Sequence, residues 1–260
     1  MIYFLSDAHL GSRAISDHDA HQQRLIACLK QMSKDAEAVF LLGDMFDFWC
    51  EFFYGRAGKP HGFDAVLQAL RDLSAHCPVH FFIGNHDIWT FGWLAQQTSM
   101  IIHKQPLDIT LYGKRCYLAH GDGLGSSDRK FLFIKRLFHN PLAQFLFRMV
   151  PPTLGNQLGY SWAHASRRKH SLTPNLYKGE NEEEQIVFAK THEQTEHFDY
   201  YIFGHRHLEM QLLLSTGAQV CVLGDFFEQF SYATLSRDGV FSFSAYSPES
   251  EQEQSCAILV

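Results

Sequence analysis

The chain lacks the cysteine pairs that would cross-link a fold or hold a zinc ion. Its 260 residues include six cysteines, with no CxxC pair and no repeated spacing. Neither a disulfide framework nor a thiolate zinc site is therefore expected. Several of these cysteines stand inside apolar runs, which predicts small core residues in a reducing cytoplasm.

Long apolar stretches are missing as well. No run reaches the roughly 18 uninterrupted apolar residues that a membrane-spanning helix needs. The first residues, Met1 to Leu5, form an apolar strand-like run with no basic segment before it, which is unlike a signal peptide. We therefore expect a cytoplasmic protein that is at most peripheral to the inner face of a membrane.

Acidic residues are absent from one long segment. Residues 129–179 contain nine of the 22 Lys and Arg residues and none of the 28 Asp and Glu residues, so this segment carries +9 and the rest of the chain −15. The net charge of −6 conceals that asymmetry. The whole molecule gives no indication of nucleic-acid binding, and we predict no protein partner.

Short apolar runs bounded by Gly and Asp predict buried strands. They lie at 2–5, 39–42, 79–83, 116–119, 200–203 and 220–223. Amphipathic stretches around 25–32 and 63–73 predict helices, and residues 109–118 and 232–243 predict hairpins. Together these patterns favour an α/β fold, a layered α/β/β/α sandwich of two mixed sheets flanked by helices. We expect one domain over residues 1–260, with a mobile tail over 247–260 that is rich in Ser, Glu and Gln.

Polar motifs follow five of these runs, where ligands of α/β folds collect. They are DxH at 7–9, GDxxD at 43–47, GNHD at 84–87, HGD at 120–122 and GHRH at 204–207. Any one motif alone would indicate a turn residue or an ordinary histidine. Five in order, each after a predicted strand, favour a single chemical site. Histidines outside the motifs, among them His21, His80 and His103, are expected to be solvated.

The ordered set resembles the signature of the calcineurin-like metallophosphoesterases. Hydrolysis of a phosphate ester needs positive charge at the phosphoryl oxygens and a nucleophile at neutral pH. Two metal ions about 3.5–4 Å apart supply both. Imidazole, carboxylate and amide ligands suit Mn²⁺, Fe or Zn²⁺. We expect two divalent ions, with Mn²⁺ as the first choice.

The resemblance also implies a role for each motif residue. Asp44 would bridge the two ions. One ion would be held by Asp7, His9 and His207, and the other by Asn85, His120 and His205. His86 would stabilise the transition state or protonate the leaving group, and Asp87 would hold the second ring nitrogen of His86. Asp47 would orient a ligand or cap a turn.

The basic segment is also rich in apolar residues. Phe131–Ile134 and Phe145–Phe147 crowd beside its basic residues, and Pro141 and Pro151-Pro152 divide it into short helices. We expect an insert over residues 124–180 that folds over the site as a lid. Its composition suits an amphiphilic anionic ligand or an anionic membrane surface. The alternative is a helical hairpin that packs on the core with its basic face in water.

The opening Phe4-Leu5-Ser6-Asp7, the following Leu10-Gly11-Ser12 and the insert make the chain similar to the UDP-2,3-diacylglucosamine diphosphatases. That similarity implies cleavage of a UDP-linked diacyl sugar into UMP and a lipid monophosphate in lipid A assembly. Our candidates for contacts to substrate phosphates are Arg13, Ser166, Arg167 and Arg168. The chain differs from that group at His86, where its best-known members have arginine and phosphoesterases at large have histidine.

Other functions stay open. The substrate could be soluble, such as a nucleotide or a phosphoprotein. A non-catalytic, metal-bound protein that docks on membranes is another alternative. A nuclease could use the basic segment, although its dense aliphatic and aromatic residues suit lipid better than a phosphate backbone.

Overall fold

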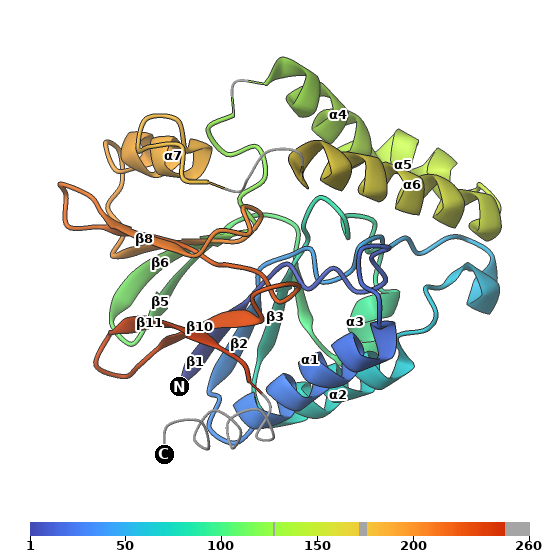
Figure 1. Cartoon of the computed structure of the whole chain (residues 1–260), viewed down its shortest axis with the longest axis horizontal. Helices are drawn as coiled ribbons and strands as arrows, with labels where there is room; N and C mark the ends of the chain where they lie inside the picture. The colour runs from blue at the N-terminus through green and yellow to red at the C-terminus, as the bar shows by residue number, and fades with distance from the viewer. Residues whose placement is uncertain (127, 172–175, 248–260) are drawn as a thin grey trace, which may run out of the picture.

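Two mixed sheets lie face to face in the computed structural model of the chain, and helices cover their outer faces (Figure 1). The structure describes residues 1–126, 128–171 and 176–247, with the backbone alone for residues 166–171. The strand order is β11-β10-β1-β2-β3-β4 in the first sheet and β5-β6-β7-β9-β8 in the second. The expected layered α/β/β/α sandwich is confirmed.

The first sheet carries three of the five motifs. Its strands are β1 (Ile2–Leu5), β2 (Ala38–Leu41), β3 (Val79–Phe82), β4 (Ile101–His103), β10 (Ser231–Leu235) and β11 (Phe241–Ala245). Strands β1 to β4 run parallel, and β10 and β11 are antiparallel additions at the β1 edge. Three helices cover its outer face, namely α1 (His18–Met32), α2 (Asp64–His76) and α3 (Trp93–Thr98). Leu25, Leu67 and Leu94 pack from these helices into the first core cluster.

The second sheet carries the remaining two motifs. Its strands are β5 (Leu107–Leu111), β6 (Lys114–Ala119), β7 (Tyr200–Phe203), β8 (Met210–Leu213) and β9 (Gln219–Val222). Strands β6, β7 and β9 are parallel, while β5 and β8 are antiparallel edges. Helix α7 (Glu184–His192) covers its outer face with Ile186 and Ala189. Between the two sheets lies a core that includes Phe4, Phe40 and Ile202.

Most of the expected elements are present. All six predicted strands and both hairpins form, although β2 and β9 each begin and end one residue earlier than the apolar run suggested. The two predicted helices form as α1 and α2. Helix α1 begins after Asp17, whose side chain accepts a hydrogen bond from the backbone N–H of Ala20, as an N-cap does.

The basic segment folds into three helices at one end of the sandwich (Figure 1). They are α4 (Arg129–His139), α5 (Pro141–Arg148) and α6 (Pro152–Ser171). The side chains of Asp128 and Asn140 cap α4 and α5. Proline is tolerated in the first turn of a helix but not in its interior, so Pro141 and Pro152 begin helices and divide the segment as expected. The boundaries 124–180 of the insert stay a prediction.

Five cysteines, Cys28, Cys50, Cys77, Cys116 and Cys221, are buried and free, which confirms their expected place in the core. Cys256 and nearly all of the expected mobile tail lie outside the described residues. In the described part of the chain, no helix combines the length and apolar character that crossing a bilayer requires.

Candidate functional site

The motifs converge because the parallel strands of both sheets end at the same edge of the sandwich. Asp7 follows β1, and its backbone N–H donates to the carbonyl of Gly43 after β2 at 3.0 Å. Across the two sheets, the N–H of His205 donates to Asp7 Oδ2 at 2.9 Å. The N–H of Gly204 donates to the carbonyl of His120 at 2.9 Å. These bonds join the loops of both sheets into one site.

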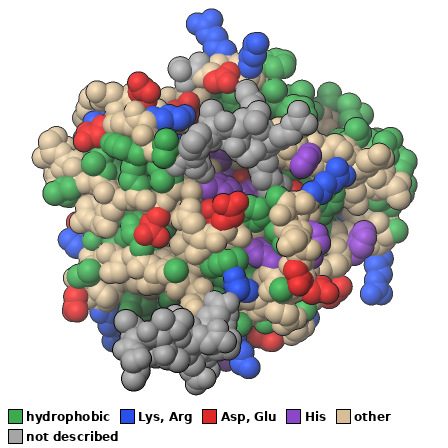
Figure 2. All heavy atoms as spheres, viewed as in Figure 1, with side chains coloured by type: hydrophobic (Ala, Val, Ile, Leu, Met, Phe, Trp, Pro, Cys, Tyr) green, Lys and Arg blue, Asp and Glu red, His purple; other side chains and the backbone are tan. Residues whose placement is uncertain are grey.

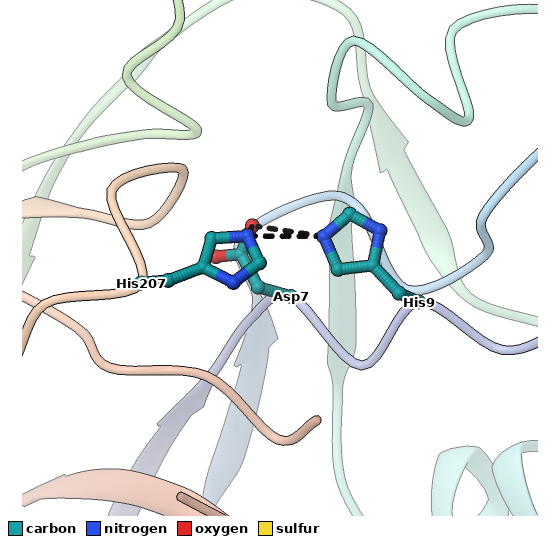
Figure 3. A group of neighbouring side chains, drawn as sticks. All are labelled: Asp7, His9 and His207. Atoms are coloured by element: carbon teal, nitrogen blue, oxygen red, sulfur yellow. Dashed lines mark hydrogen bonds and ion pairs between the residues drawn. The ribbon is translucent and has the colours of Figure 1, made fainter. Parts of the chain in front are cut away.

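Asp7, His9 and His207 form the first cluster of the site (Figure 3). The Nε2 atoms of His9 and His207 face each other at 3.1 Å. Asp7 Oδ1 lies 3.4 Å from Nε2 of His207 and 3.8 Å from Nε2 of His9. Among the described residues, this buried oxygen has no hydrogen-bond donor. A bare carboxylate oxygen and two facing imidazole nitrogens are the donor set that a divalent cation would satisfy.

Asp44, His120 and His205 form the second cluster. Asp44 Oδ2 lies 3.3 Å from Nε2 of His120, and the amide oxygen of Asn85 lies 3.3 Å from that same nitrogen. Nδ1 of His120 donates to the carbonyl of Leu42 at 2.7 Å, which leaves Nε2 facing the site. Asp44 also belongs to a third group with His9 and His86. Its carboxylate therefore lies between the clusters, as a shared ligand requires.

Burial and charge set the protonation of these rings. Burial favours the neutral form of His120, but the adjacent Asp44 carboxylate raises the pKa of His120 to about 10. Burial and the neighbouring His120 lower the pKa of His205 to about 4. A cation bound here would displace the proton of His120, so metal affinity should rise with pH.

Five of the seven proposed ligands have left-handed backbone. Their φ angles are 56° at Asp7, 44° at His9, 53° at Asp44, 71° at His205 and 50° at His207. Each such residue costs about 1–3 kcal/mol and marks a functional site when the surrounding structure enforces it. The turn after β3 also needs glycine, because a Cβ at Gly84 would lie 2.1 Å from Asp44 Oδ1.

The prediction that Asp87 holds the second ring nitrogen of His86 was wrong. Its Nδ1 lies 2.8 Å from the carbonyl oxygen of Asp47, and not against Asp87. Asp87 instead accepts hydrogen bonds from the backbone N–H groups of Gly84 at 2.6 Å and Met45 at 2.8 Å. Adjacent residues in this tight loop point to opposite sides, so Asp87 holds the loops together while His86 faces the site. Burial, with the nearby Asp44 charge, raises the pKa of Asp87 to about 7.

Several residues make contacts in the structure that the sequence patterns did not fully predict. Asp225 accepts three backbone N–H bonds, as a turn residue does, and its Oδ2 also lies 3.6 Å from Nδ1 of His207. Asp47 Oδ1 lies 3.5 Å from Nδ1 of His9, where it can orient that ring, one of the two roles expected for Asp47. His21 is buried, with Nε2 2.8 Å from the carbonyl oxygen of Ala8, and is not solvated as expected. His80 and His103 are half-buried, with ring nitrogens 2.8 Å apart. Only the position of Asp225 after a strand could have indicated its role.

An apolar cavity of about 340 Å³ opens beside the site, under the insert. The loop after β2 contributes Asp47 and Phe48, and the loop after β3 contributes Asn85, His86, Ile88 and Trp89. The insert contributes residues of α4, α5 and α6, namely Leu137, Phe138, Ala143, Gln144, Phe147, Leu158, Gly159, Trp162 and Ala163. The insert therefore lies over the site as a lid would, and apolar side chains from its three helices line the cavity.

The structure describes the side chain of only one of the four residues proposed for substrate phosphates. Arg13 is exposed in the loop after β1. Ser166, Arg167 and Arg168 lie on α6, where their side chains fall outside the described residues. Phe133 is 67% exposed and does not line the cavity.

Comparison with known proteins decides the family of this site. The family model described as calcineurin-like phosphoesterase matches residues 1–209. The chain belongs to this family. It is therefore a metal-dependent phosphoester hydrolase.

Curated relatives of this phosphoesterase share one name, UDP-2,3-diacylglucosamine hydrolase. That of Porphyromonas gingivalis is 38% identical over 246 residues, covering 89% of this chain and 92% of the relative. That of Psychromonas ingrahamii is 26% identical and covers 91% and 94%. That of Edwardsiella ictaluri is 31% identical and covers 78% and 74%.

Replacing the shared carboxylate should disable the phosphoesterase. We expect Asp44→Ala to lose bound metal and nearly all hydrolysis, because the oxygens that lie between the two clusters disappear. Metal content by mass spectrometry and turnover of an aryl phosphate measure the two effects. Two ions per chain with near-normal turnover would contradict the assignment of Asp44 as a bridge.

Replacing His86 should separate chemistry from metal binding. We expect His86→Ala to retain its metal and to lose about 10²- to 10⁴-fold in turnover, as removal of a positioned acid or charge-stabilising group does. The same two measurements apply. Loss of one metal ion would show instead that His86 is a ligand, in the third group with His9 and Asp44.

Proposed function

We propose that this phosphoesterase cleaves the pyrophosphate of a UDP-linked glucosamine that carries two acyl chains, releasing UMP and the lipid monophosphate. The observation that carries the proposal is the apolar cavity that adjoins Asn85 and His86. A substrate with hydrocarbon chains next to a pyrophosphate needs an apolar chamber beside the phosphoryl site. The name shared by the three relatives agrees with this substrate.

Two divalent ions fit the proposed chemistry, and Mn²⁺ suits the mixed donor set. We assign Asp7, His9 and His207 to one ion, Asn85, His120 and His205 to the other, and Asp44 to both. When bound, such ions supply positive charge at the phosphoryl oxygens and lower the pKa of a coordinated water. Iron or zinc would suit the same donors.

We propose that His86 acts on the substrate. The carbonyl of Asp47 accepts the proton of Nδ1, so Nε2 is the ring atom left for the substrate. In this tautomer Nε2 carries a proton only when the ring is charged. A protonated His86 would therefore offer the leaving phosphate both positive charge and a proton. The exposed Arg13, with Ser166, Arg167 and Arg168 on α6, remains our proposal for contacts to the outer phosphates.

Release of UMP tests the proposal directly. Detergent-dispersed UDP-2,3-diacylglucosamine should be cleaved far faster than nucleotides, phosphopeptides or aryl phosphates, with UMP and the lipid monophosphate as the only products. Faster turnover of a soluble nucleotide or phosphopeptide would support the alternative substrates. Absence of all hydrolysis by the metal-loaded protein would support a non-catalytic role.

Charge placed in the cavity should affect the lipid substrate selectively. Leu158 on α6 lines the cavity yet is 52% exposed, so Leu158→Asp should fold, but its carboxylate would face the acyl chains. We expect kcat/KM for the lipid to fall at least about tenfold, because burying a charge against hydrocarbon is costly. Hydrolysis of an aryl phosphate should be unchanged.

The matched control is Phe133→Asp on α4. Phe133 is exposed and lies outside the cavity lining, so this variant should retain both activities. Circular dichroism checks the fold of each variant first. Equal loss of the two activities in Leu158→Asp would count against an acyl chamber, and equal effects of the two variants would show a nonspecific charge effect.

We further propose that the outer face of the insert contacts an anionic membrane. Figure 2 shows hydrophobic side chains gathered at the upper right, over α5 and α6. Leu142, Phe145, Leu146, Met149 and Leu154 are among the exposed apolar residues there. Segment 129–179 supplies nine basic residues and no acidic ones. Large exposed apolar surface with basic charge suits the interface of an anionic bilayer.

Liposome sedimentation tests this contact. Binding to vesicles with phosphatidylglycerol should exceed binding to neutral vesicles and should weaken as salt rises, because the basic residues near the surface are screened. Equal binding to both kinds of vesicle, or none, would contradict the proposal while leaving the hydrolytic function intact.

A further inference from the structure

One ion pair connects helix α4 of the insert to a loop that carries a proposed metal ligand, and a second pair lies just beyond the end of the insert and hydrogen-bonds to its last residues. The first joins Lys135 on α4 to Asp122, two residues beyond His120. Lys135 Nζ lies 2.8 Å from Asp122 Oδ2 and also donates to the carbonyl of Asp122. The side chains of Lys135 and Asp122 are 30% and 12% exposed, so this pair is largely shielded from water.

Helix α4 also packs directly on the loop that follows His120. A Cβ added at Gly123 would lie 3.0 Å from the ring of Phe131 and 3.4 Å from Leu132. Gly123 has a φ of 68°, in the region that favours glycine. The helix and the loop therefore touch without a gap, and a shift of α4 would carry the loop of His120 with it.

The second pair lies at the other end of the insert. Arg206 stands between His205 and His207, and its guanidinium binds both oxygens of Glu183 at 2.9 and 3.0 Å. Glu183 is 2% exposed, and its Oε1 also accepts the N–H of Lys178 at 3.0 Å. A further guanidinium N–H donates to the carbonyl of Leu176 at 3.4 Å. The last residues of the basic segment are thus tied to the loop that bears two imidazoles.

The second ion pair contributes more to the orientation of the loop around Arg206 than to the stability of the fold. A buried ion pair gains little net free energy, because desolvation of both charges offsets their attraction. A bidentate guanidinium–carboxylate contact does fix an orientation. With Arg206 held outward, the alternate residues His205 and His207 turn into the site, each with left-handed backbone. Gln185 adds a hydrogen bond from Nε2 to the carbonyl of Gly204 at 2.9 Å.

We propose that Lys135–Asp122 and Arg206–Glu183 are positioning pairs through which docking of the insert and occupancy of the metal centre stabilise each other. The inference rests on the proposed two-metal centre. Coupling between two sites is reciprocal. An insert held by both pairs raises the affinity of the loops for metal, and bound metal in turn holds the insert over the cavity.

The test uses the full chain and Mn²⁺ as the probe. Lys135→Met and Glu183→Gln each remove one charge while keeping similar shape. We expect the dissociation constant for Mn²⁺, from competition with a chelator, to rise about 10- to 100-fold, as when outer partners of metal ligands are lost. Lys135→Arg keeps the charge and should restore most of the affinity.

Two neighbouring residues provide matched controls. Arg136 is exposed on the same helix as Lys135, and Glu184 is exposed and directly follows Glu183. Arg136→Met and Glu184→Gln remove the same charges next to the pairs, so they should leave Mn²⁺ affinity unchanged. A fall equal to that of the pair variants would mean that net charge alone sets the affinity, which would overturn the proposal.

Hydrogen exchange tests whether bound metal in turn stabilises the docked insert. Adding Mn²⁺ to the unaltered protein should slow amide exchange in α4, and this protection should be smaller in Lys135→Met and Glu183→Gln. Unchanged metal affinity in folded variants would overturn the inference even if thermal stability fell, because that is the mark of a merely structural role. If one variant does not fold, the variant of the other pair decides. If the unaltered protein binds no Mn²⁺, the proposed metal centre itself is wrong. If the unaltered protein binds Mn²⁺ and hydrolyses its substrate, and the variants bind Mn²⁺ equally well, only the coupling is refuted.

Discussion

Negative charge concentrated at the strand ends is the constraint on which the rest of this structure depends. Asp7, Asp44 and Asp87 are all buried there. Each is compensated locally: Asp87 by backbone N–H groups, and Asp7 and Asp44 by N–H groups together with imidazoles. A buried carboxylate without such partners would be costly. Asp7 Oδ1 accepts no hydrogen bond from the described residues and lies among imidazole nitrogens, which makes the site a place for cations.

The scaffold enforces a backbone that the ligands would not adopt alone. Five proposed ligands have positive φ, and the parallel strands before them are fully paired and buried. Strain of this kind persists where rigid neighbours over-determine it. The donor atoms are therefore already in place before a metal ion binds, so less conformational entropy of the ligand residues is lost on binding.

The insert adds substrate selection to this general site. Its inner face completes an apolar cavity beside His86, and its positive charge contrasts with the net negative charge of the rest of the chain. Because its contacts also reach the loops of His120 and His207, the insert is more than a cover laid on a finished centre. The same ion pairs that hold the insert in place constrain the direction of the imidazoles.

The sequence by itself determined the strands, both hairpins, the layered fold and the residues that gather at the site, since each rests on short-range periodicity and on motifs placed directly after strands. Short elements such as β4 and α3 left too little pattern to predict. Only the tertiary structure decided that Asp47 and not Asp87 meets His86, that Phe133 faces outward, and that Lys135 reaches Asp122. Such contacts depend on the direction of a side chain within a tight loop or on how two separate loops pack. Neither is recorded in local hydrophobic spacing, because both are fixed only when the two sheets and the insert close around the buried charges.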